Sequence, residues 1–306
     1  MARIDCGRVV TLDAPVIFDT DAHASLPLAW QAFARQLRRP LPRAAVIAFA
    51  GPIEGEVLKL TNSAWMIRPA TLAGELGIDR CLVLNDFGAV AHAVAHVGAE
   101  YLRPLCGPDR PLPTAGAISI VGPGTGLGVA ILLRSEGHYH VQEAEGGHAD
   151  FAPLDSLEDA LVARLRPLHR RVSVERIVSG PGLQAIHSVL AQIEARSAPP
   201  MDDAALWKLA MAGGDTLAAA ALDRFCMSLG AVAGDMALAH GAAAVVIAGG
   251  IGLRLADRLP RSGFAARFVA KGRFETRMTA LPVKVLTHPE PGLLGAAAAL
   301  AREHGG

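Results

Sequence analysis

The sequence predicts an α/β protein whose mostly parallel or mixed sheets are flanked by helices. Short apolar runs typical of buried strands alternate along the chain with longer stretches whose apolar residues recur at helical spacing. Glycine and proline separate the two kinds of segment. The chain has 306 residues, of which 51% are hydrophobic, so it can bury a large core and is long enough for two domains.

Most of the predicted strands are apolar runs that stop at glycine, proline or a polar pair. The run at residues 44–49 ends at Ala50-Gly51-Pro52, and the run at residues 81–84 ends at Asn85-Asp86. Two runs that follow Gly126 have the spacing of a hairpin. Strands are predicted at residues 8–12, 15–19, 44–49, 81–84, 117–121, 127–133, 138–142, 244–248 and 283–286.

The predicted helices are stretches in which apolar residues recur every three or four positions. The longest stretch contains Gly213-Gly214, which predicts a break there, and further helix is expected between residues 249 and 282. Helices are predicted at residues 27–37, 87–97, 156–168, 181–195, 203–240 and 291–302.

Four prolines and a glycine between residues 104 and 113 predict a hinge-like connection between two lobes. The smaller α/β lobe is expected to span residues 1–112 and to be rejoined by the closing helix at 291–306. The larger α/β lobe is expected at residues 113–290.

Composition and charge exclude several classes of function. The formal net charge is zero and no long charged run occurs, so neither nucleic acid nor a membrane is an expected partner. The four cysteines are scattered without metal-ligand spacing, which is typical of reduced thiols in the cytoplasm. The start has no segment like a signal peptide, and the apolar run at residues 241–252 is too short to span a bilayer. A cytoplasmic protein is expected.

Two polar motifs lie close together in the sequence, between residues 122 and 148. Gly124, Thr125 and Gly126 belong to a glycine-rich loop directly after a strand, where backbone N–H groups can approach a phosphate. Glu145-Gly146-Gly147-His148 offers a carboxylate and an imidazole to the hydroxyls of a polyol. The pair of motifs favours phosphoryl transfer to a sugar. Taken singly, each has a plainer interpretation: a tight hairpin turn for the first and a solvated loop for the second.

Asn85 and Asp86 stand at the carboxyl end of a buried strand, which is where ligands bind in open α/β sheets. Asp86 could take the proton of an attacking hydroxyl while Asn85 orients the same sugar. The alternative is that Asp86 only caps the following helix. Glu175 and the Gly249-Gly250 pair also have plain alternatives, as an exposed helical residue and as a strand end.

These segments, in this order, resemble the bacterial glucokinase family of ATP-dependent hexose kinases. The resemblance covers residues 44–300 and is highly specific, because several motifs are long. The motifs are Ala48-Phe-Ala-Gly-Pro52, Leu60-Thr-Asn-Ser-Ala-Trp65, Leu84-Asn-Asp-Phe87, the loop at residues 122–128, Glu145-Gly-Gly-His-Ala-Asp-Phe-Ala-Pro153, Val174-Glu-Arg-Ile-Val-Ser-Gly-Pro-Gly-Leu183, Ile247-Ala-Gly-Gly-Ile251 and Pro291-Gly-Leu-Leu-Gly295.

The resemblance implies a two-lobe actin-like ATPase (ribonuclease H-like) fold and transfer of the ATP γ-phosphoryl group to the 6-hydroxyl of D-glucose, the entry step of glycolysis. It implies Mg²⁺ as cofactor, with ligands that the sequence leaves unknown, a cleft between the lobes, and a homodimer. It also implies one role for each site residue. Asp86 is the catalytic base; Asn85, Glu145, His148 and Glu175 bind glucose; Gly124, Thr125 and Gly126 contact the ATP phosphates; Gly249 and Gly250 lie near the adenosine.

One departure from the family pattern concerns the start of the chain. Members of the family begin with a strand that carries an Asp-x-Gly-Gly-Thr phosphate loop, whereas here Met1-Ala2-Arg3-Ile4 stands where that motif would end. Asp5 has no Gly-Gly-Thr behind it. We expect either a start placed too far downstream or a catalytically impaired relative that binds sugar or regulates. Low activity is the expectation for the chain as it stands.

Overall fold

The computed structural model describes residues 1–5, 8–37, 40–51, 53–60, 64–197 and 201–304. Within it the chain divides into two compact units, Met1–His96 with His288–Gly306 (unit 1) and Val97–Thr287 (unit 2). Cys6, Pro52 and residues 61–63, which belong to the sequence motifs above, lie outside the described residues.

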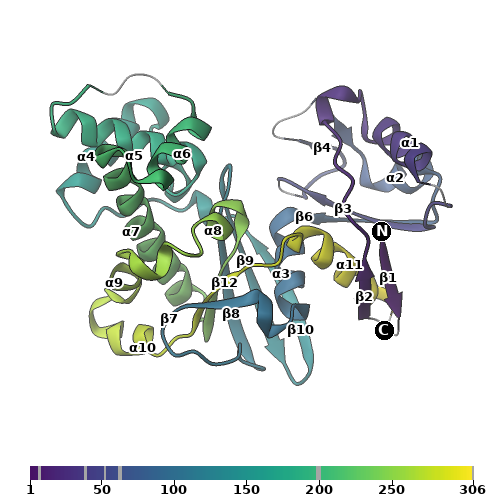
Figure 1. Cartoon of the computed structure of the whole chain (residues 1–306). Helices are drawn as coiled ribbons and strands as arrows, with labels where there is room; N and C mark the ends of the chain where they lie inside the picture. The colour runs from purple at the N-terminus through teal and green to yellow at the C-terminus, as the bar shows by residue number, and fades with distance from the viewer. Residues whose placement is uncertain (6–7, 38–39, 52, 61–63, 198–200, 305–306) are drawn as a thin grey trace. The chain divides into compact units, whose positions relative to one another are not determined.

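Unit 1 contains short sheets and four helices of more than one turn among its described residues. Its largest parallel pair is β3 with β6, in a register that places Phe49 opposite Asn85, so both strands end at the same edge (Figure 1). The elements are β1 (Ala2–Asp5), β2 (Arg8–Leu12), η1 (Thr20–Ala22), α1 (Leu26–Gln36), β3 (Ala44–Phe49), β4 (Leu58–Lys59), β5 (Met66–Ile67), α2 (Pro69–Leu76), β6 (Arg80–Asn85), α3 (Asp86–His96) and α11 (Pro291–His304).

Two strand assignments in unit 1 differ from the sequence prediction. The strand predicted at residues 15–19 is wrong: that segment has no strand partner, Pro15 lacks a backbone N–H, and Ile17 is 89% exposed. Conversely, the unpredicted strand β1 pairs antiparallel with β2, with Ala2 opposite Leu12. The partner of the predicted strand at residues 8–12 is therefore the segment just before it.

Close helix packing joins the two ends of unit 1. α3 lies against α11, and a methyl group added to Gly295 of α11 would collide with the backbone carbonyl of Ala89 in α3. The small side chains of Ala89, Ala93 and Ala298 are buried in the same unit. A second cluster surrounds Phe49 and consists of Leu58, Ile67, Leu72 and Leu76.

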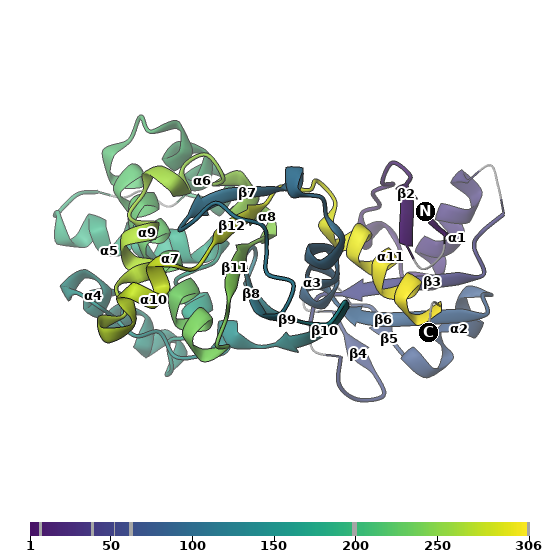
Figure 2. The same cartoon turned by 90° about the horizontal axis from the view of Figure 1, so that it is seen from below.

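Unit 2 is built on a six-stranded mixed sheet of order β10-β9-β8-β11-β12-β7. β11 runs parallel to β8 and β12, and the remaining pairs are antiparallel (Figure 2). Its strands are β7 (Leu102–Cys106), β8 (Gly116–Pro123), β9 (Leu127–Ser135), β10 (His138–Ala144), β11 (Ala244–Ile247) and β12 (Val283–Leu286). The mixed α/β fold class predicted from the sequence is confirmed.

The helices of unit 2 cover this sheet, and α4, α5 and α6 lie together around one end of α7 (Figure 1). They are α4 (Ser156–His169), α5 (Gly180–Ile193), α6 (Asp203–Ala212), α7 (Thr216–Ala239), α8 (Gly249–Arg254), α9 (Phe264–Val269) and α10 (Glu275–Thr279), with the short helices η2 (Ala99–Tyr101), η3 (Gly146–His148), η4 (Val174–Arg176), η5 (Leu259–Arg261) and η6 (Gly272–Phe274). The predicted break at Gly213-Gly214 is confirmed, since Gly213 ends α6 in the left-handed region and Asp215 caps α7.

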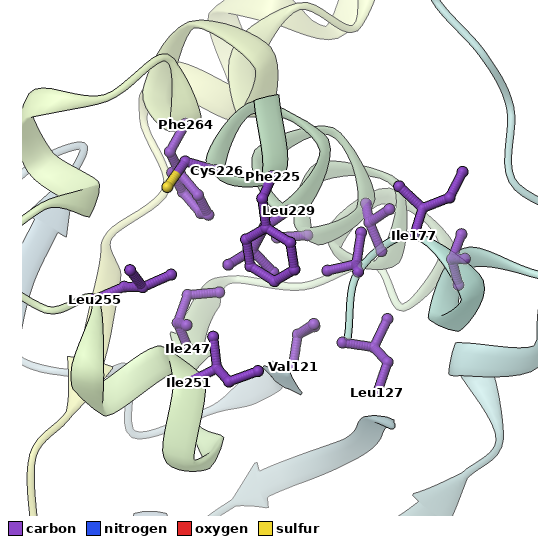
Figure 3. Packing of buried hydrophobic residues seen from close by; sticks show 14 of the residues in the cluster. Val121, Leu127, Ile177, Phe225, Cys226, Leu229, Ile247, Ile251, Leu255 and Phe264 are labelled. Atoms are coloured by element: carbon purple, nitrogen blue, oxygen red, sulfur yellow. The ribbon is translucent and has the colours of Figure 1, made fainter. Parts of the chain in front are cut away.

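The core of unit 2 lies between the sheet and α7. Figure 3 shows Val121, Leu127 and Ile247 gathered with Phe225 and Leu229 of α7 in one cluster of buried side chains. α7 is long and apolar enough to cross a membrane by composition alone, but 72% of its apolar window is buried inside the unit. Its apolar character is therefore explained by core packing.

The proline-rich segment of unit 2 corrects one further expectation. The start of the predicted hinge-like connection, residues 104–106, belongs to β7, which pairs antiparallel with β12 at the edge of the sheet. Pro104 is tolerated there because an edge strand does not need every backbone N–H. Unit 2 as the structure divides the chain begins at Val97 and includes this strand.

Candidate functional site

In unit 1, Asn85 and Asp86 lie where β6 passes directly into α3. The Asn85 Oδ1 accepts hydrogen bonds from the backbone N–H groups of Phe87 (2.8 Å) and Gly88 (3.1 Å), so Asn85 caps the helix. Its Nδ2 donates to the carbonyl of Gly51 at 3.0 Å, which ties the ends of β3 and β6 together. The capping role that the sequence offered as the alternative for Asp86 therefore belongs mainly to its neighbour.

Asp86 is the first residue of α3 and is exposed. Its Oδ1 accepts from the Phe87 backbone N–H at 2.8 Å. The positive end of the helix dipole favours the ionised form of a carboxylate at this position, which is the form that a general base requires.

In unit 2, the glycine-rich loop is the hairpin turn between β8 and β9. The strands pair up to Pro123 and Leu127, which leaves Gly124, Thr125 and Gly126 as the turn. Within it the Gly124 N–H donates to the Gly126 carbonyl at 2.8 Å. The plain interpretation as a hairpin turn is thus correct in geometry. It does not exclude phosphate binding, because the turn is short of side chains and Thr125 is exposed.

Glu145 and His148 lie together at the two ends of the short helix η3. The Glu145 Oε2 is 3.8 Å from the His148 Nε2, and the two side chains are 60% and 56% exposed. Gly147 between them is required by packing, because a methyl group there would collide with the carbonyl of Leu127. The carboxylate and imidazole are therefore presented directly beside the start of β9.

Glu175 is half-buried on η4, and its side chain reaches the glycine-rich turn. Its Oε2 accepts a hydrogen bond from the backbone N–H of Leu127 at 3.0 Å. The η4 backbone is joined to the end of η3, since the Val174 N–H donates to the Ala149 carbonyl at 2.9 Å. Glu145, His148 and Glu175, which come from two separate sequence motifs, thus lie on adjacent elements.

Gly249 and Gly250 begin α8 immediately after β11. Gly249 has a φ of +76°, and a Cβ there would lie 2.6 Å from the Pro123 carbonyl oxygen, so only glycine fits against the end of β8. Gly250 is exposed, with no atom within 4 Å of where a Cβ would stand. The two glycines therefore differ in role: the first allows close packing, and the second leaves open space.

The sequence analysis missed the contact made by Gly180. Residues 180–183 entered it only as part of a family motif, yet the Gly180 N–H donates to the Gly124 carbonyl at 2.7 Å. The Gly180 carbonyl in turn accepts from the Trp207 Nε1 at 3.0 Å. The Ser-Gly-Pro-Gly pattern, which is a helix start, was the available signal.

No cluster of metal ligands accompanies these groups. Within the described ranges, no three His, Cys, Asp or Glu side chains are placed to hold a metal ion. The three described cysteines are unpaired, and burial raises the pKa of the Cys81 thiol to about 11 and that of Cys106 to about 12, so these thiols are structural rather than nucleophilic.

The fold and the site together define a class of protein, the sugar kinases with the actin-like ATPase fold. A glucokinase from an Antarctic psychrotroph superimposes with a TM-score of 0.83 at 32% identity, covering 97% of this chain and 92% of that one. A ROK family glucokinase from Streptomyces griseus, solved in complex with glucose and AMPPNP, shares the fold with a TM-score of 0.59 at 18% identity, over 99% and 95% of the two chains.

Within that class the chain belongs to the glucokinase family. The family model described as Glucokinase matches residues 2–303. The chain is 61% identical over 304 residues to a glucokinase of Zymomonas mobilis subsp. mobilis, covering 99% of this chain and 94% of that protein. The resemblance to bacterial glucokinases inferred from the sequence is confirmed.

Proposed function

We propose that this protein is a glucokinase, which transfers the γ-phosphoryl group of ATP to the 6-hydroxyl of D-glucose. Family membership and the 61% identical relative support the activity. The structural observation that carries the proposal is the convergence in unit 2 of sugar-type ligands on a glycine-rich turn, through the bond from the Leu127 N–H to Glu175.

The proposed glucose ligands of unit 2 are Glu145, His148 and Glu175, and Asn85 is the proposed glucose ligand of unit 1. Carboxylates accept hydrogen bonds from sugar hydroxyls, and an imidazole can accept or donate. The exposed Glu145 and His148, 3.8 Å apart, form one edge of this site. Hydrogen bonds of hydroxyls to charged carboxylates are stronger than those between neutral groups, which supports acidic ligands for a polyol.

Asp86 acts as the general base. Its carboxylate accepts the proton of the glucose 6-hydroxyl while that oxygen forms the new bond to the γ-phosphorus and the bond from the γ-phosphorus to the β–γ bridging oxygen breaks, leaving ADP.

The ATP phosphates are bound by the backbone N–H groups and hydroxyl of the turn formed by Gly124, Thr125 and Gly126. Gly249 and Gly250 approach the adenosine, where a residue without a side chain admits a flat base or ribose. Mg²⁺ commonly binds through substrate phosphates and only one or two carboxylates, so a site without a dedicated protein cage fits a metal that arrives with the nucleotide. Bound there, Mg²⁺ neutralises charge on the phosphates.

The proposal also includes a homodimer and a cytoplasmic location, as the family resemblance implies. The molar mass of the purified protein measured by light scattering tests the first, because one chain is 31.8 kDa. A monomer at micromolar concentration would contradict it.

The activity is tested with the purified protein, glucose and MgATP, by following ADP and glucose 6-phosphate formation together. Turnover in the ordinary range for kinases, about 1–100 per second, would show that the low activity expected from the sequence is wrong. The matched control is 6-deoxyglucose, which lacks the acceptor hydroxyl and should bind without consuming ATP. Glucose binding with no phosphorylation would favour the sugar-binding regulator instead, and no glucose binding would contradict both functions.

A further inference from the structure

One carboxylate in unit 2, proposed as a sugar ligand, contacts the glycine-rich turn that is proposed to bind phosphate. Glu175, a proposed glucose ligand, already uses its Oε2 to accept from the Leu127 N–H at the end of the glycine-rich turn, 3.0 Å away. A methyl group added to Gly126 would collide with the same oxygen, so the carboxylate lies flat against the turn. A sugar ligand is therefore also a support for the phosphate-binding turn.

The segment that carries Glu175 is rigidly held. Val174 on one side is buried, Ile177 and Val178 on the other side are fully buried, and the Val174 N–H donates to the Ala149 carbonyl. A few residues later the Gly180 N–H donates to the Gly124 carbonyl at 2.7 Å. The segment from η4 to the start of α5 therefore holds the turn at both ends, by a carboxylate at Leu127 and by an amide at Gly124.

A carboxylate has two oxygens and about four acceptor positions, so Glu175 can keep its bond to Leu127 while it accepts a sugar hydroxyl. A sugar bound in this way restrains the Glu175 side chain against the turn. Since a restrained turn loses less conformational entropy when a phosphate binds, sugar binding should increase nucleotide affinity. By thermodynamic linkage, nucleotide binding must increase sugar affinity by the same factor.

We propose that Glu175 is a positioning residue that couples the two substrate sites: by bridging glucose and the backbone of the glycine-rich turn, it makes glucose and nucleotide bind cooperatively. This inference rests on the proposed function, because it takes glucose and ATP as the two ligands. It adds a coupling role to a residue that was otherwise assigned only to the sugar.

A pair of glycine substitutions in unit 2 gives the sharpest test. Gly126→Ala pushes the flexible end of Glu175 off the turn without removing any hydrogen-bonding group, whereas Gly214 lies outside the proposed site and a Cβ there meets no atom within 4 Å. Neither glycine has a positive φ, so the backbone at both positions allows alanine. Glucose and AMPPNP affinities are measured by calorimetry in the parent, Gly126→Ala and Gly214→Ala, each ligand alone and at saturation of the other.

We expect glucose to raise AMPPNP affinity about fivefold or more in the parent and in Gly214→Ala, the low end of measured couplings between sites. In Gly126→Ala the ratio should fall to near one, and glucose affinity should drop about tenfold, as for the loss of a hydrogen bond to a charged group. Equal coupling in the two variants, or no coupling in the parent, would overturn the proposal. A parent that fails to phosphorylate glucose would contradict the proposed function instead.

A second pair of variants tests the support directly and serves if Gly126→Ala does not fold. Without sugar, Glu175→Ala should weaken AMPPNP binding several-fold, because the turn loses its acceptor, and Glu175→Gln should largely restore it, because the amide oxygen can still accept from Leu127. If Glu175 only repelled phosphate charge, both variants would bind AMPPNP more tightly than the parent. Tighter binding in both would therefore overturn the proposal.

Discussion

The two units of this protein bury their apolar side chains in different ways. Unit 2 surrounds a six-stranded sheet with one large cluster in which Phe225, Phe264 and Phe268 are completely buried. Unit 1 has a small cluster around Phe49 and a helix pair whose contact depends on Gly295 and alanines. Large aromatic cores stabilise mainly through buried area, whereas glycine-alanine contacts depend on close approach of backbones.

The division of functional groups follows this difference. The proposed sugar ligands Glu145, His148 and Glu175 are attached to the heavily packed unit, on short helices that are hydrogen bonded to one another and to the turn. Asp86, the proposed base, stands on the more lightly packed unit, at the start of a helix whose other face meets α11. Binding and proton transfer should therefore respond to different substitutions.

The largest expected effect separates chemistry from binding. Asp86→Asn removes the base but keeps the size of the side chain, so turnover should fall about 10²- to 10⁴-fold while glucose affinity stays near that of the parent. Steady-state kinetics together with a glucose titration by calorimetry measure both quantities. Turnover within a few-fold of the parent would leave Asp86 with a structural role only.

The next largest expected effect is a weaker binding of glucose to unit 2, with a smaller free-energy change than the effect of Asp86→Asn on turnover. Glu145→Ala removes a charged acceptor, so glucose binding should weaken by about 1.5–3 kcal/mol with little change in AMPPNP affinity. The matched control is Glu143→Ala on β10, which removes the same charge two residues before Glu145 and outside the motif. Equal effects of the two changes would point to a general electrostatic effect and not to a ligand.

The third expected effect is on the stability of unit 1, which depends on the close packing of α3 and α11 at Gly295. Gly295→Ala forces a methyl group onto the Ala89 carbonyl and should lower the free energy of unfolding by about 1–3 kcal/mol. Gly292→Ala, in the same helix with nothing within 4 Å, should be neutral or slightly stabilising because alanine favours helix. Thermal unfolding measures the stability of each variant, and hydrogen exchange shows whether the loss of stability lies in unit 1. Equal midpoints for both would mean that α3 and α11 are not in close contact.

The smallest expected effect is a pH dependence in unit 2. Burial lowers the pKa of His240, whose Nδ1 lies 3.0 Å from the Ser119 Oγ. The unfolded chain then takes up a proton near pH 6.5 before the folded one does, so stability is full above that pH and declines as the pH falls below it. The slope should be at most about 1.4 kcal/mol per pH unit from this group. Thermal midpoints between pH 8 and 5.5 should decline less in His240→Asn than in the parent.

The sequence predicted best those elements whose own pattern decides their structure. β8 is a continuous apolar run, and α7 has helical periodicity between Gly213-Gly214 and the glycine at 241, so both followed from local spacing. β7 and β1 did not follow from local spacing. Each is a short strand that contains a proline or polar residues, and pairing with another strand decides its structure more than its own sequence pattern does.

The candidate site shows the same limit. Which residue types belong to it could be read from the motifs, and the structure gathers Glu145, His148 and Glu175 on adjacent elements of unit 2. The sequence did not reveal that Asn85 caps α3 or that Gly180 bonds to Gly124, since both contacts depend on backbone geometry. Motifs identify the chemical groups of the site, whereas the hydrogen bonds that hold those groups in place can be found only in the folded structure.

The order of the segments in unit 1 determines when this unit can fold during synthesis. Its chain leaves the unit after His96 and returns only at His288, so α11 is synthesised after all of unit 2. Domains generally fold as units during synthesis, N-terminal ones first. Here the ribosome must deliver the whole of unit 2 before α3 meets the helix that covers it. Unit 2 can therefore complete its sheet while α3 is still uncovered, because α11 has not yet been synthesised.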